Sequence, residues 1–275
     1  MSIQLQTGHF FGQSSRRFTG AHVILSELAY REVRRLPRHS HQSAYVSLLM
    51  HGQYRDRLTG RLVDYTPFQA GFRPALTEHT DEYGKGVNRF FNIEIDARFL
   101  DGLLADQGQS SLPPMLCGAR TAMFACSLYQ NFLKETFTEL AAESVVAEIM
   151  GDVSRMREVV ERGKPRWLLR AVDYLHANVS RNLPLFEVAR EAGVHPVHLS
   201  RVFRMRFKTT MGSLVTHLRV QRSCVPLAVG TMTLCDIAAD CGFADQSHFS
   251  RVFKARLGLA PVAYRRLHRI AANET

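Results

Sequence analysis

The sequence of 275 residues predicts an α+β protein of two domains. The first is an antiparallel β-barrel followed by a helical segment, and the second is an all-α domain with two helix-turn-helix units in tandem. Three observations lead to this prediction: short strand-like segments in the first half, a segment that occurs twice in the last hundred residues, and an excess of positive charge in the second half.

The repeated segment indicates the two helix-turn-helix units. It reads HLSRVFR from residue 198 and HFSRVFK from residue 248, an offset of 248 − 198 = 50 residues. Each copy follows a short helix-like run in which an Ala precedes a Gly by four residues, first Ala189 and Gly193, then Ala238 and Gly242. The small Ala lets two helices cross closely, and the Gly permits a left-handed turn between them.

Charge separates the two predicted domains. Residues 1–160 hold 17 Lys and Arg against 17 Asp and Glu, whereas residues 161–275 hold 18 against 8. The net charge of +10 therefore lies entirely in the C-terminal part, which predicts a polyanionic partner for that domain. The boundary falls at residues 161–165, a polar stretch with Gly and Pro that is typical of a linker.

Cysteine usage and hydropathy predict a cytoplasmic protein. The five cysteines form no C-x-x-C pair, and a buried apolar role is expected for each; Cys235 and Cys241, six residues apart, leave a redox role open. The start of the chain lacks the basic and apolar regions of a signal peptide. No apolar run reaches the 18 residues of a membrane span, so no membrane partner is expected.

Short strand-like segments broken by Gly and Pro fill residues 31–96. They include residues 45–50, 54–58, 61–65 and 90–95. Strands of this length between turn residues favour an antiparallel barrel or sandwich. Helical segments follow over about 113–160, and the first domain is therefore predicted to span residues 1–160 and the second residues 161–275.

Between residues 139 and 158, apolar residues recur at spacings of three to five. They are Leu140, Val145, Ile149, Val153 and Met156. Such a stripe predicts a helix that buries one face. That face fits either packing on the chain's own barrel or dimerisation, and we expect a homodimer through this region.

Residues 37–79 resemble the two sequence motifs of the cupins, a family of small double-sheet barrels. PRHSH at 37–41, followed by a Tyr and a Gly, is similar to the first motif, and a Pro five residues before His79 is similar to the second. The family's metal ligands fall on His39, His41, Tyr45 and His79, with Tyr45 where the family has Glu. The resemblance implies a pocket lined by these four side chains, which we expect to bind a small-molecule effector and no cofactor. Three His could still hold a divalent ion.

Each predicted recognition helix has an apolar face and a polar, basic face. The apolar pairs, 50 residues apart, are Leu199 and Phe249, Val202 and Val252, and Phe203 and Phe253. The polar face carries Val197, Ser200, Arg201 and Arg204 in the first unit and Ser247, Ser250, Arg251 and Lys254 in the second. One face anchors while the other meets DNA, as a helix in a major groove requires. The alternative is a basic face that contacts only solvent.

One helix over residues 211–229 is predicted to join the two units. Nineteen residues span about 28 Å, which is comparable to the roughly 34 Å between successive major grooves on one face of DNA. Pro226 interrupts this helix, because a proline inside a helix removes a hydrogen bond and costs ~3 kcal/mol or more. We therefore expect the helix either to kink at Pro226 or to end near Cys224.

The stretch from Asp236 to Arg265 closely resembles the signature of the AraC/XylS family of transcription regulators. The resemblance is carried by DIA at 236–238, GFADQSHFSRVFK at 242–254, and then Gly258, Pro261, Tyr264 and Arg265. It implies promoter binding by two recognition helices in successive major grooves of double-stranded DNA, with control by an effector or by dimerisation. The family's base-contacting positions fall on Val197, Ser200, Arg201, Gln246, Ser247, Ser250 and Arg251. RNA polymerase is a further implied partner and activation an implied outcome, although the residues themselves do not separate activators from repressors.

The sequence therefore predicts a DNA-binding transcription regulator with an N-terminal effector domain, and not an enzyme. One alternative is a metal-dependent cupin enzyme fused to a DNA-binding domain, but Tyr45 in the Glu position argues against it. A second alternative is an architectural protein that bends DNA without sequence preference. Two recognition helices of different composition argue against that class.

Overall fold

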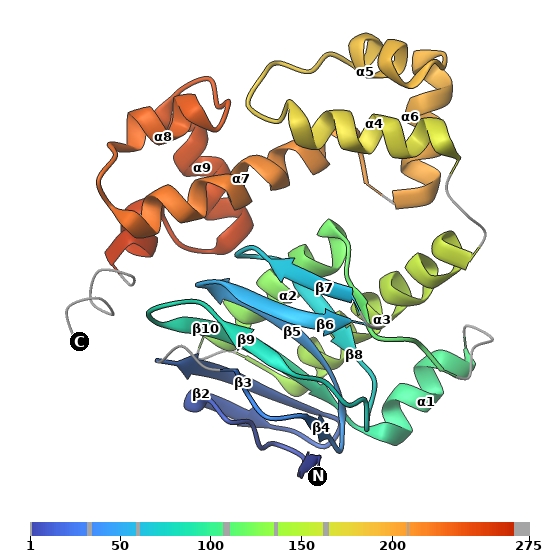
Figure 1. Cartoon of the computed structure of the whole chain (residues 1–275), viewed down its shortest axis with the longest axis vertical. Helices are drawn as coiled ribbons and strands as arrows, with labels where there is room; N and C mark the ends of the chain where they lie inside the picture. The colour runs from blue at the N-terminus through green and yellow to red at the C-terminus, as the bar shows by residue number, and fades with distance from the viewer. Residues whose placement is uncertain are drawn as a thin grey trace. The chain divides into compact units, whose positions relative to one another are not determined.

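The computed structural model describes residues 2–31, 35–58, 61–106, 111–134, 137–161, 165–207 and 209–266. The chain divides into two compact units, Met1–Arg157 and Glu158–Thr275. Within the described residues, the first unit holds the strands and the second is helical (Figure 1). The predicted α+β composition, an antiparallel sheet region followed by a helical helix-turn-helix region, is confirmed.

The larger sheet of the first unit is six-stranded and antiparallel. Its strands are β2 (Gln13–Thr19), β3 (Val23–Tyr30), β5 (Ala44–His51), β8 (Ala70–Arg73), β10 (Asn88–Ile95) and β11 (Met115–Leu116). They lie in the order β11-β8-β5-β10-β3-β2. The centre of this sheet is formed by the long β10, which pairs with β3 on one side and β5 on the other.

Shorter strands form the opposite layer. They are β1 (Ile3–Leu5), β4 (His39–His41), β6 (Tyr54–Leu58), β7 (Arg61–Tyr65) and β9 (Asp81–Tyr83). Here β7, β6 and β9 form one sheet, and β1 pairs in parallel with β4. Two isolated bridges, Arg35 to Glu82 and His39 to His79, connect the β4 region to the β9 region.

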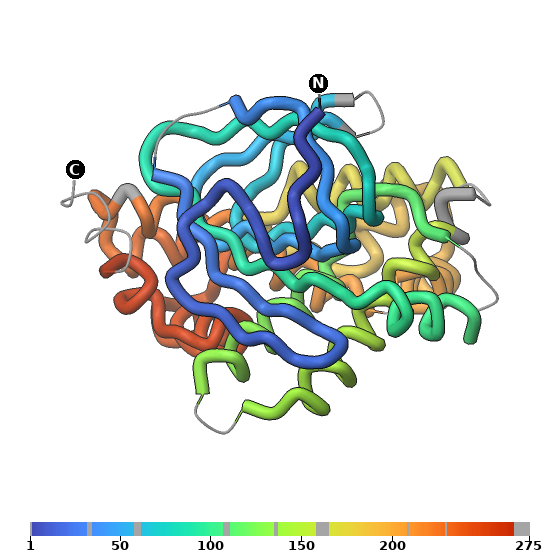
Figure 2. Tube along the Cα trace, turned by 90° about the horizontal axis from the view of Figure 1, so that it is seen from below, coloured from blue at the N-terminus to red at the C-terminus, as the bar shows by residue number. Residues whose placement is uncertain are grey.

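The predicted β-barrel is not closed, because among the described residues no strand of one layer pairs with a strand of the other. The strands of the second layer are only three to five residues long, too short to carry the ladder round into a closed cylinder. The result is an open sandwich. Figure 2 shows the N-terminal segment lying across these strands.

Alternation along β10 places aromatic side chains on both faces of the large sheet. Phe90 points between the layers, where it packs in a cluster with Leu49, Tyr54, Tyr65 and Tyr83. Its neighbour Phe91 points outward, toward a helix layer. There the rings of Tyr129 and Phe132, both in α2 (Ala119–Phe132), lie 5.1 and 5.5 Å from it. The sheet is therefore covered on both faces.

The apolar stripe of residues 139–158 lies on α3 (Glu139–Glu161) and packs mainly within the unit. Ile149 and Val153 are fully buried by the chain itself. Thr121 Oγ1 of α2 donates to Asp152 Oδ2 at 2.7 Å and ties the two helices together. This is the packing alternative of the sequence analysis, since only Leu140 of the stripe is largely exposed, at 73%. Dimerisation through this region stays a prediction. A short helix, α1 (Ala97–Ala105), precedes α2.

The second unit contains the two predicted helix-turn-helix units. Their helices are α4 (Arg166–Ala177), α5 (Leu185–Ala192) and α6 (Pro196–Phe207), then α7 (Met211–Val229), α8 (Leu234–Asp240) and α9 (Gln246–Leu257). The bounds of α6 and α9 differ by 50 residues at each end, the offset of the sequence repeat. Residues 261–266 are also helical. Residues 162–164 of the predicted linker lie outside the described residues.

Local sequence signals explain where these helices begin and turn. Thr233 Oγ1 accepts from the backbone N–H of Asp236 at 3.1 Å and caps α8, and Asp245 Oδ1 accepts from the N–H of His248 at 2.7 Å and caps α9. Thr and Asp are residues that favour this capping position. Gly193 and Gly242 have φ of 73° and 84°, a left-handed conformation that glycine adopts without strain.

The helix α7 continues through Pro226. The N–H of Gly230 bonds to the carbonyl oxygen of Pro226 at 3.1 Å, and the helix ends there at a left-handed Gly230. The alternative end near Cys224 is therefore wrong, and the full length predicted for the connecting helix is confirmed. The same helix packs against α8 and α9.

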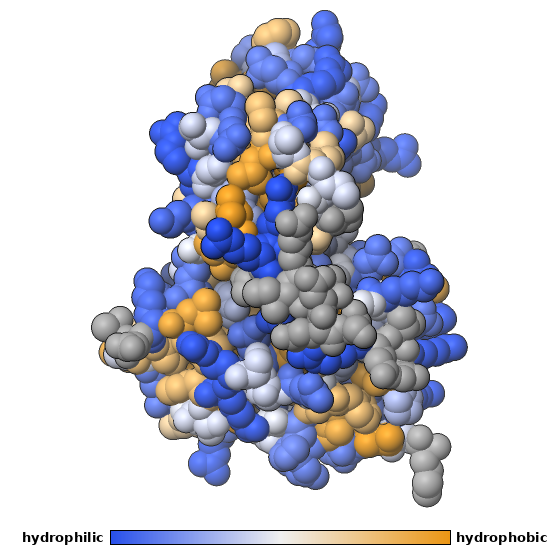
Figure 3. All heavy atoms as spheres, turned by 90° about the vertical axis from the view of Figure 1, so that its left-hand side faces the viewer, coloured by the Kyte–Doolittle hydropathy of each residue, from blue (hydrophilic) through white to orange (hydrophobic). Residues whose placement is uncertain are grey.

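The molecular surface is largely hydrophilic on the face shown in Figure 3, with apolar side chains in small patches. Patches of this kind are usual for folded proteins. Within the described residues, no helix combines the length and the apolar character that crossing a bilayer requires.

Candidate nucleic-acid interface and histidine cluster

The helices α6 and α9 present matching exposed faces. Of the nine predicted DNA-contacting side chains, none is buried. Those on α6 are Val197, which is 68% exposed, the exposed Arg201 and Arg204, and the half-buried Ser200. Those on α9 are the exposed Gln246, Ser247, Arg251 and Lys254 and the half-buried Ser250. Solvent reaches both faces, so both can approach a groove of DNA.

The opposite sides of the two helices are anchored by aromatic rings. Phe203 and Phe253 are buried, and each ring contacts a second Phe of its own helix. The ring centroids lie 4.6 Å apart for Phe203 and Phe207 and 5.5 Å apart for Phe253 and Phe249. Val252, predicted to be buried, is half-buried. Anchoring of this kind fixes which residues of each helix face outward.

The two exposed faces differ in chemistry at equivalent positions. Val197 offers a methyl surface where Ser247 offers a hydroxyl, and Arg204 offers a planar guanidinium where Lys254 offers an ammonium. Apolar groups suit a thymine methyl, hydroxyls suit several base edges, and cations suit phosphates or guanine. The two faces therefore present different chemical groups at equivalent positions.

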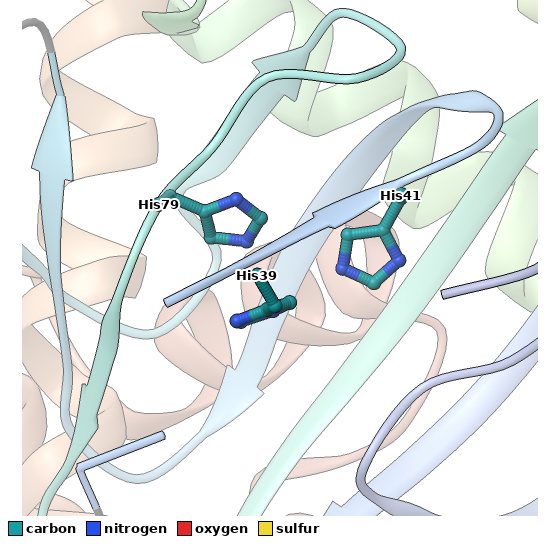
Figure 4. A group of neighbouring side chains, drawn as sticks. All are labelled: His39, His41 and His79. Atoms are coloured by element: carbon teal, nitrogen blue, oxygen red, sulfur yellow. The ribbon is translucent and has the colours of Figure 1, made fainter. Parts of the chain in front are cut away.

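Three buried histidines meet in the first unit (Figure 4). His39 and His41 alternate on β4 and so point to the same side, while His79 comes from the segment that bridges to His39. One nitrogen of each ring lies within 4.8 Å of those of the other two. The sequence prediction brought these residues together correctly.

Hydrogen bonds fix the ring nitrogens of two of them. Nδ1 of His39 lies 2.8 Å from the carbonyl oxygen of Pro37, and Nδ1 of His79 lies 3.0 Å from that of Thr77. A carbonyl only accepts, so each Nδ1 donates its proton to that oxygen. Both Nε2 atoms face the carboxylate of Asp81, at 3.6 and 3.7 Å.

Burial keeps two of these rings neutral. It lowers the pKa of His41 to about 3, with His79 and His39 adding to the effect, and it lowers the pKa of His79 to about 2, with Arg73 adding to the effect. Neutral imidazoles are the form that binds metal ions. The cluster therefore offers nitrogen lone pairs at neutral pH.

Tyr45 connects the cluster to a buried ion pair. Its hydroxyl accepts from Nε of Arg73 at 3.0 Å and lies 3.3 Å from Nε2 of His79, to which it can donate. Arg73 also donates to the buried carboxylate of Asp56. The tyrosine therefore meets a cation that is already paired with a carboxylate.

The motif search missed Arg73, Asp56 and Asp81. Asp81 accepts from the hydroxyls of Tyr54 at 2.8 Å and Tyr83 at 3.2 Å, besides facing the histidines. Its signal was available, because a residue two positions after His79 in an extended strand lies on the same side. Arg73 and Asp56 come from strands that no motif marks.

The cavity beside the cluster is small. Phe10 and Phe11 of the N-terminal segment close over it, with ring centroids 4.6 Å from His41 and 5.0 Å from His39. Its volume is about 30 Å³, enough for a water or two but far below the several hundred Å³ of a usual ligand site. A larger hollow of about 580 Å³ lies outside, and Arg73 and His79 line it together with Arg35, Arg38, Arg57, Thr77, Glu78, Thr80 and Pro114.

Comparison with known proteins places the second unit in a known class. A family model described as a helix-turn-helix domain matches residues 188–267. The HTH-type transcriptional activator AarP of Providencia stuartii is 30% identical over 92 residues, which cover 34% of this chain and 68% of AarP.

Other similarities extend over most of the chain. The HTH-type transcriptional activator RhaS of Mannheimia succiniciproducens is 24% identical over 254 residues, covering 87% of this chain and 92% of RhaS. The crystal structure of ToxT from Vibrio cholerae superposes with a TM-score of 0.40 at 14% identity, covering 90% of this chain and 98% of ToxT.

The two anchored recognition helices, with exposed faces at equivalent positions, are consistent with a DNA-binding regulator. AarP, the relative that is 30% identical, is covered over two thirds of its length and is itself a transcriptional activator of the helix-turn-helix type. The chain belongs to the AraC/XylS family of DNA-binding transcription regulators.

Proposed function

We propose that α6 and α9 each read one half-site of a promoter, and that the first unit senses a signal that controls this binding. The observation that carries the proposal is the pair of equivalent faces, in which all nine candidate contact residues avoid the core while Phe203 and Phe253 are buried. Apolar anchors beneath a polar, basic face are what a helix in the major groove needs.

Selection of binding sites from random DNA with the full chain tests this proposal. The selected sites should contain two different half-sites. Arg201→Ala and Arg251→Ala should each weaken binding by about 1–3 kcal/mol and relax the base preference in one half-site only. Arg190→Ala, an exposed arginine of α5, serves as the control. An equal loss in both half-sites, or no enriched sequence, would contradict the proposal.

We further propose that the effector is a small molecule with a carboxylate or phosphate group. The outer hollow has the volume of a usual ligand site, and four arginines but one glutamate line it. Arg38→Ala and Arg57→Ala should weaken ligand stabilisation in a thermal-shift screen of anionic metabolites. A screen in which only uncharged or cationic compounds shift the melting temperature would contradict this class.

The His39–His41–His79 cluster supports a second candidate, a divalent cation. The Nε2 atoms of His39 and His79 both face the Asp81 carboxylate, and nitrogen plus carboxylate ligands suit Zn²⁺ and similar ions. A bound cation would join β4 to the segment that carries His79, and His79→Gln should abolish its binding. Calorimetric titration with Zn²⁺ that shows no binding to the full chain would exclude this candidate.

The oligomeric state and the effect on transcription are proposed from the family. AarP and RhaS are each named transcriptional activators, and we propose that this chain also activates transcription in the cytoplasm, as a homodimer in contact with RNA polymerase. Transcription with purified polymerase on a selected promoter tests activation. Light scattering tests the dimer, and Leu140→Glu should weaken it if the exposed start of α3 takes part.

A further inference from the structure

We propose that the loop between α4 and α5, residues 178–184, locks the two helix-turn-helix units in one relative orientation, with Arg219 and Gly242 as positioning residues. In Figure 1 this loop extends from the end of α4 toward the turn between α8 and α9. The inference rests on the proposal that both recognition helices contact DNA.

Arg219 holds the loop from the connecting helix. Its Nε donates to the carbonyl oxygen of Val179 at 2.9 Å, and its Nη2 donates to that of Arg181 at 2.7 Å. The two acceptors flank Ser180, so one guanidinium fixes three consecutive residues of the loop. Charged donors make strong hydrogen bonds, and the planar fork of Arg fixes direction as well as distance.

Gly242 receives the same loop on the side of the second unit. A Cβ atom on Gly242 would lie 2.4 Å from the carbonyl oxygen of Ser180 and 2.8 Å from its Cα. Backbone therefore packs on backbone at the turn between α8 and α9. The first helix-turn-helix unit touches the second through Ser180, independently of the covalent path along α7.

The loop is rigidly held on its own side as well. Val179 is buried in the core of the first helix-turn-helix unit. The guanidinium of Arg181 lies 3.1 Å from Asn178 Oδ1 and 3.3 Å from Glu187 Oε1, and Glu187 also accepts from the hydroxyl of Tyr174 at 2.5 Å. Movement of the loop would therefore move α4 and α5 with it.

The helix α7 and the contact at Ser180 together constrain the two helix-turn-helix units more than α7 alone would. A helix alone permits each unit to rotate about the ends of α7, whereas a second contact at a distance from that axis prevents the rotation. The spacing and the angle between α6 and α9 are then properties of the free protein. The protein should accept one spacing of half-sites and reject spacings that differ by a base pair.

Binding to a spacer series tests this with the full chain. Duplexes carrying the two selected half-sites, with base pairs added or removed between them, are titrated with wild type, Arg219→Met and Arg219→Lys. Arg219→Met should lose roughly tenfold in affinity at the preferred spacing and flatten the dependence on spacing, while Arg219→Lys should fall between. Arg222→Met removes an exposed charge from the same helix and should leave the spacing profile unchanged.

Glycine substitutions give a matched second comparison. Gly193 occupies the equivalent turn of the first unit with φ of 73°, but its added Cβ would meet nothing closer than 3.5 Å. Gly193→Ala therefore carries the backbone strain without the loop contact, and Gly242→Ala carries both. Gly242→Ala should broaden the spacing profile and Gly193→Ala should not.

Three outcomes decide the matter. A wild type that binds all spacings equally would overturn both the two half-site proposal and the lock. A sharp wild-type profile that stays equally sharp in folded Arg219→Met and Gly242→Ala would overturn the lock alone. A sharp profile that broadens in these variants, but not in Arg222→Met or Gly193→Ala, would establish the lock.

Discussion

The hydroxyl of Tyr45 accepts a hydrogen bond from Nε of Arg73 at 3.0 Å, at the position where the cupin motif has a Glu. Burial raises the pKa of this hydroxyl, so it stays protonated and neutral. A carboxylate here would lie close to Asp56 and Asp81 around a single arginine. The tyrosine instead orients Arg73 without adding charge to the cluster.

Removing this hydroxyl should destabilise the first unit. Tyr45→Phe leaves Nε of Arg73 without its acceptor in a buried site, and we expect a loss of about 1–3 kcal/mol in the free energy of unfolding. Urea denaturation followed by circular dichroism measures it. Tyr174→Phe removes a half-buried hydroxyl from the second unit and should cost less. An equal cost for the two variants would argue against the buried network.

Salt dependence should separate phosphate contacts from base contacts. If Arg204 near the end of α6 meets a phosphate, Arg204→Ala should weaken binding to all sequences and lower the slope of log K against log salt by about 1. Titrations of DNA between low and physiological salt measure that slope. A change in base preference with an unaltered slope would instead assign Arg204 to a base.

Acid should weaken the second unit through His217. Burial, with the nearby Arg256 adding to the effect, lowers the pKa of His217 to about 4. The unfolded chain therefore takes up this proton near pH 6.5 and the folded chain only near pH 4, so stability falls as the pH drops through that window.

Between pH 7.5 and pH 5.5, the free energy of unfolding should fall by about 1 kcal/mol less in His217→Gln than in wild type. The fluorescence of Trp167, the only tryptophan of the chain and a residue of α4, reports unfolding of this unit. Parallel pH profiles for wild type and variant would mean that another group causes the acid sensitivity.

Pro226 should influence how far apart the recognition helices lie. Pro226→Ala restores a backbone donor inside α7, and a straighter helix should change the preference among half-site spacings by about 1 kcal/mol, roughly fivefold. The same spacer series measures it. Identical profiles for variant and wild type would show that the helix has the same course with either residue.

The helical unit was predictable because its signals are local. Thr233 and Asp245 cap the helices that follow them, and the glycines at 193 and 242 mark the turns. Because the segment is repeated with an offset of 50 residues, a helix face predicted for one copy is predicted for the other as well. What determines a helix-turn-helix lies within about 25 residues, inside the range of a sequence pattern.

The sandwich was less predictable because its determinants are far apart in sequence. Arg73 meets Tyr45 across 28 residues and Asp56 across 17, and no spacing rule connects such strands. Edge strand β2 has an exposed, polar sequence without alternation, so its sequence carries no strand signal. The lock at Ser180 was invisible for the same reason, since Arg219 and Gly242 reach it from separate helices.

If α6 and α9 read DNA as proposed, the unlike residues Val197 and Ser247 give the bound duplex a direction. Two different half-sites fit the protein in one order only. Inverting a binding site would turn the molecule end over end and exchange upstream for downstream. Promoters controlled by this chain should therefore carry the site in a single orientation toward the gene.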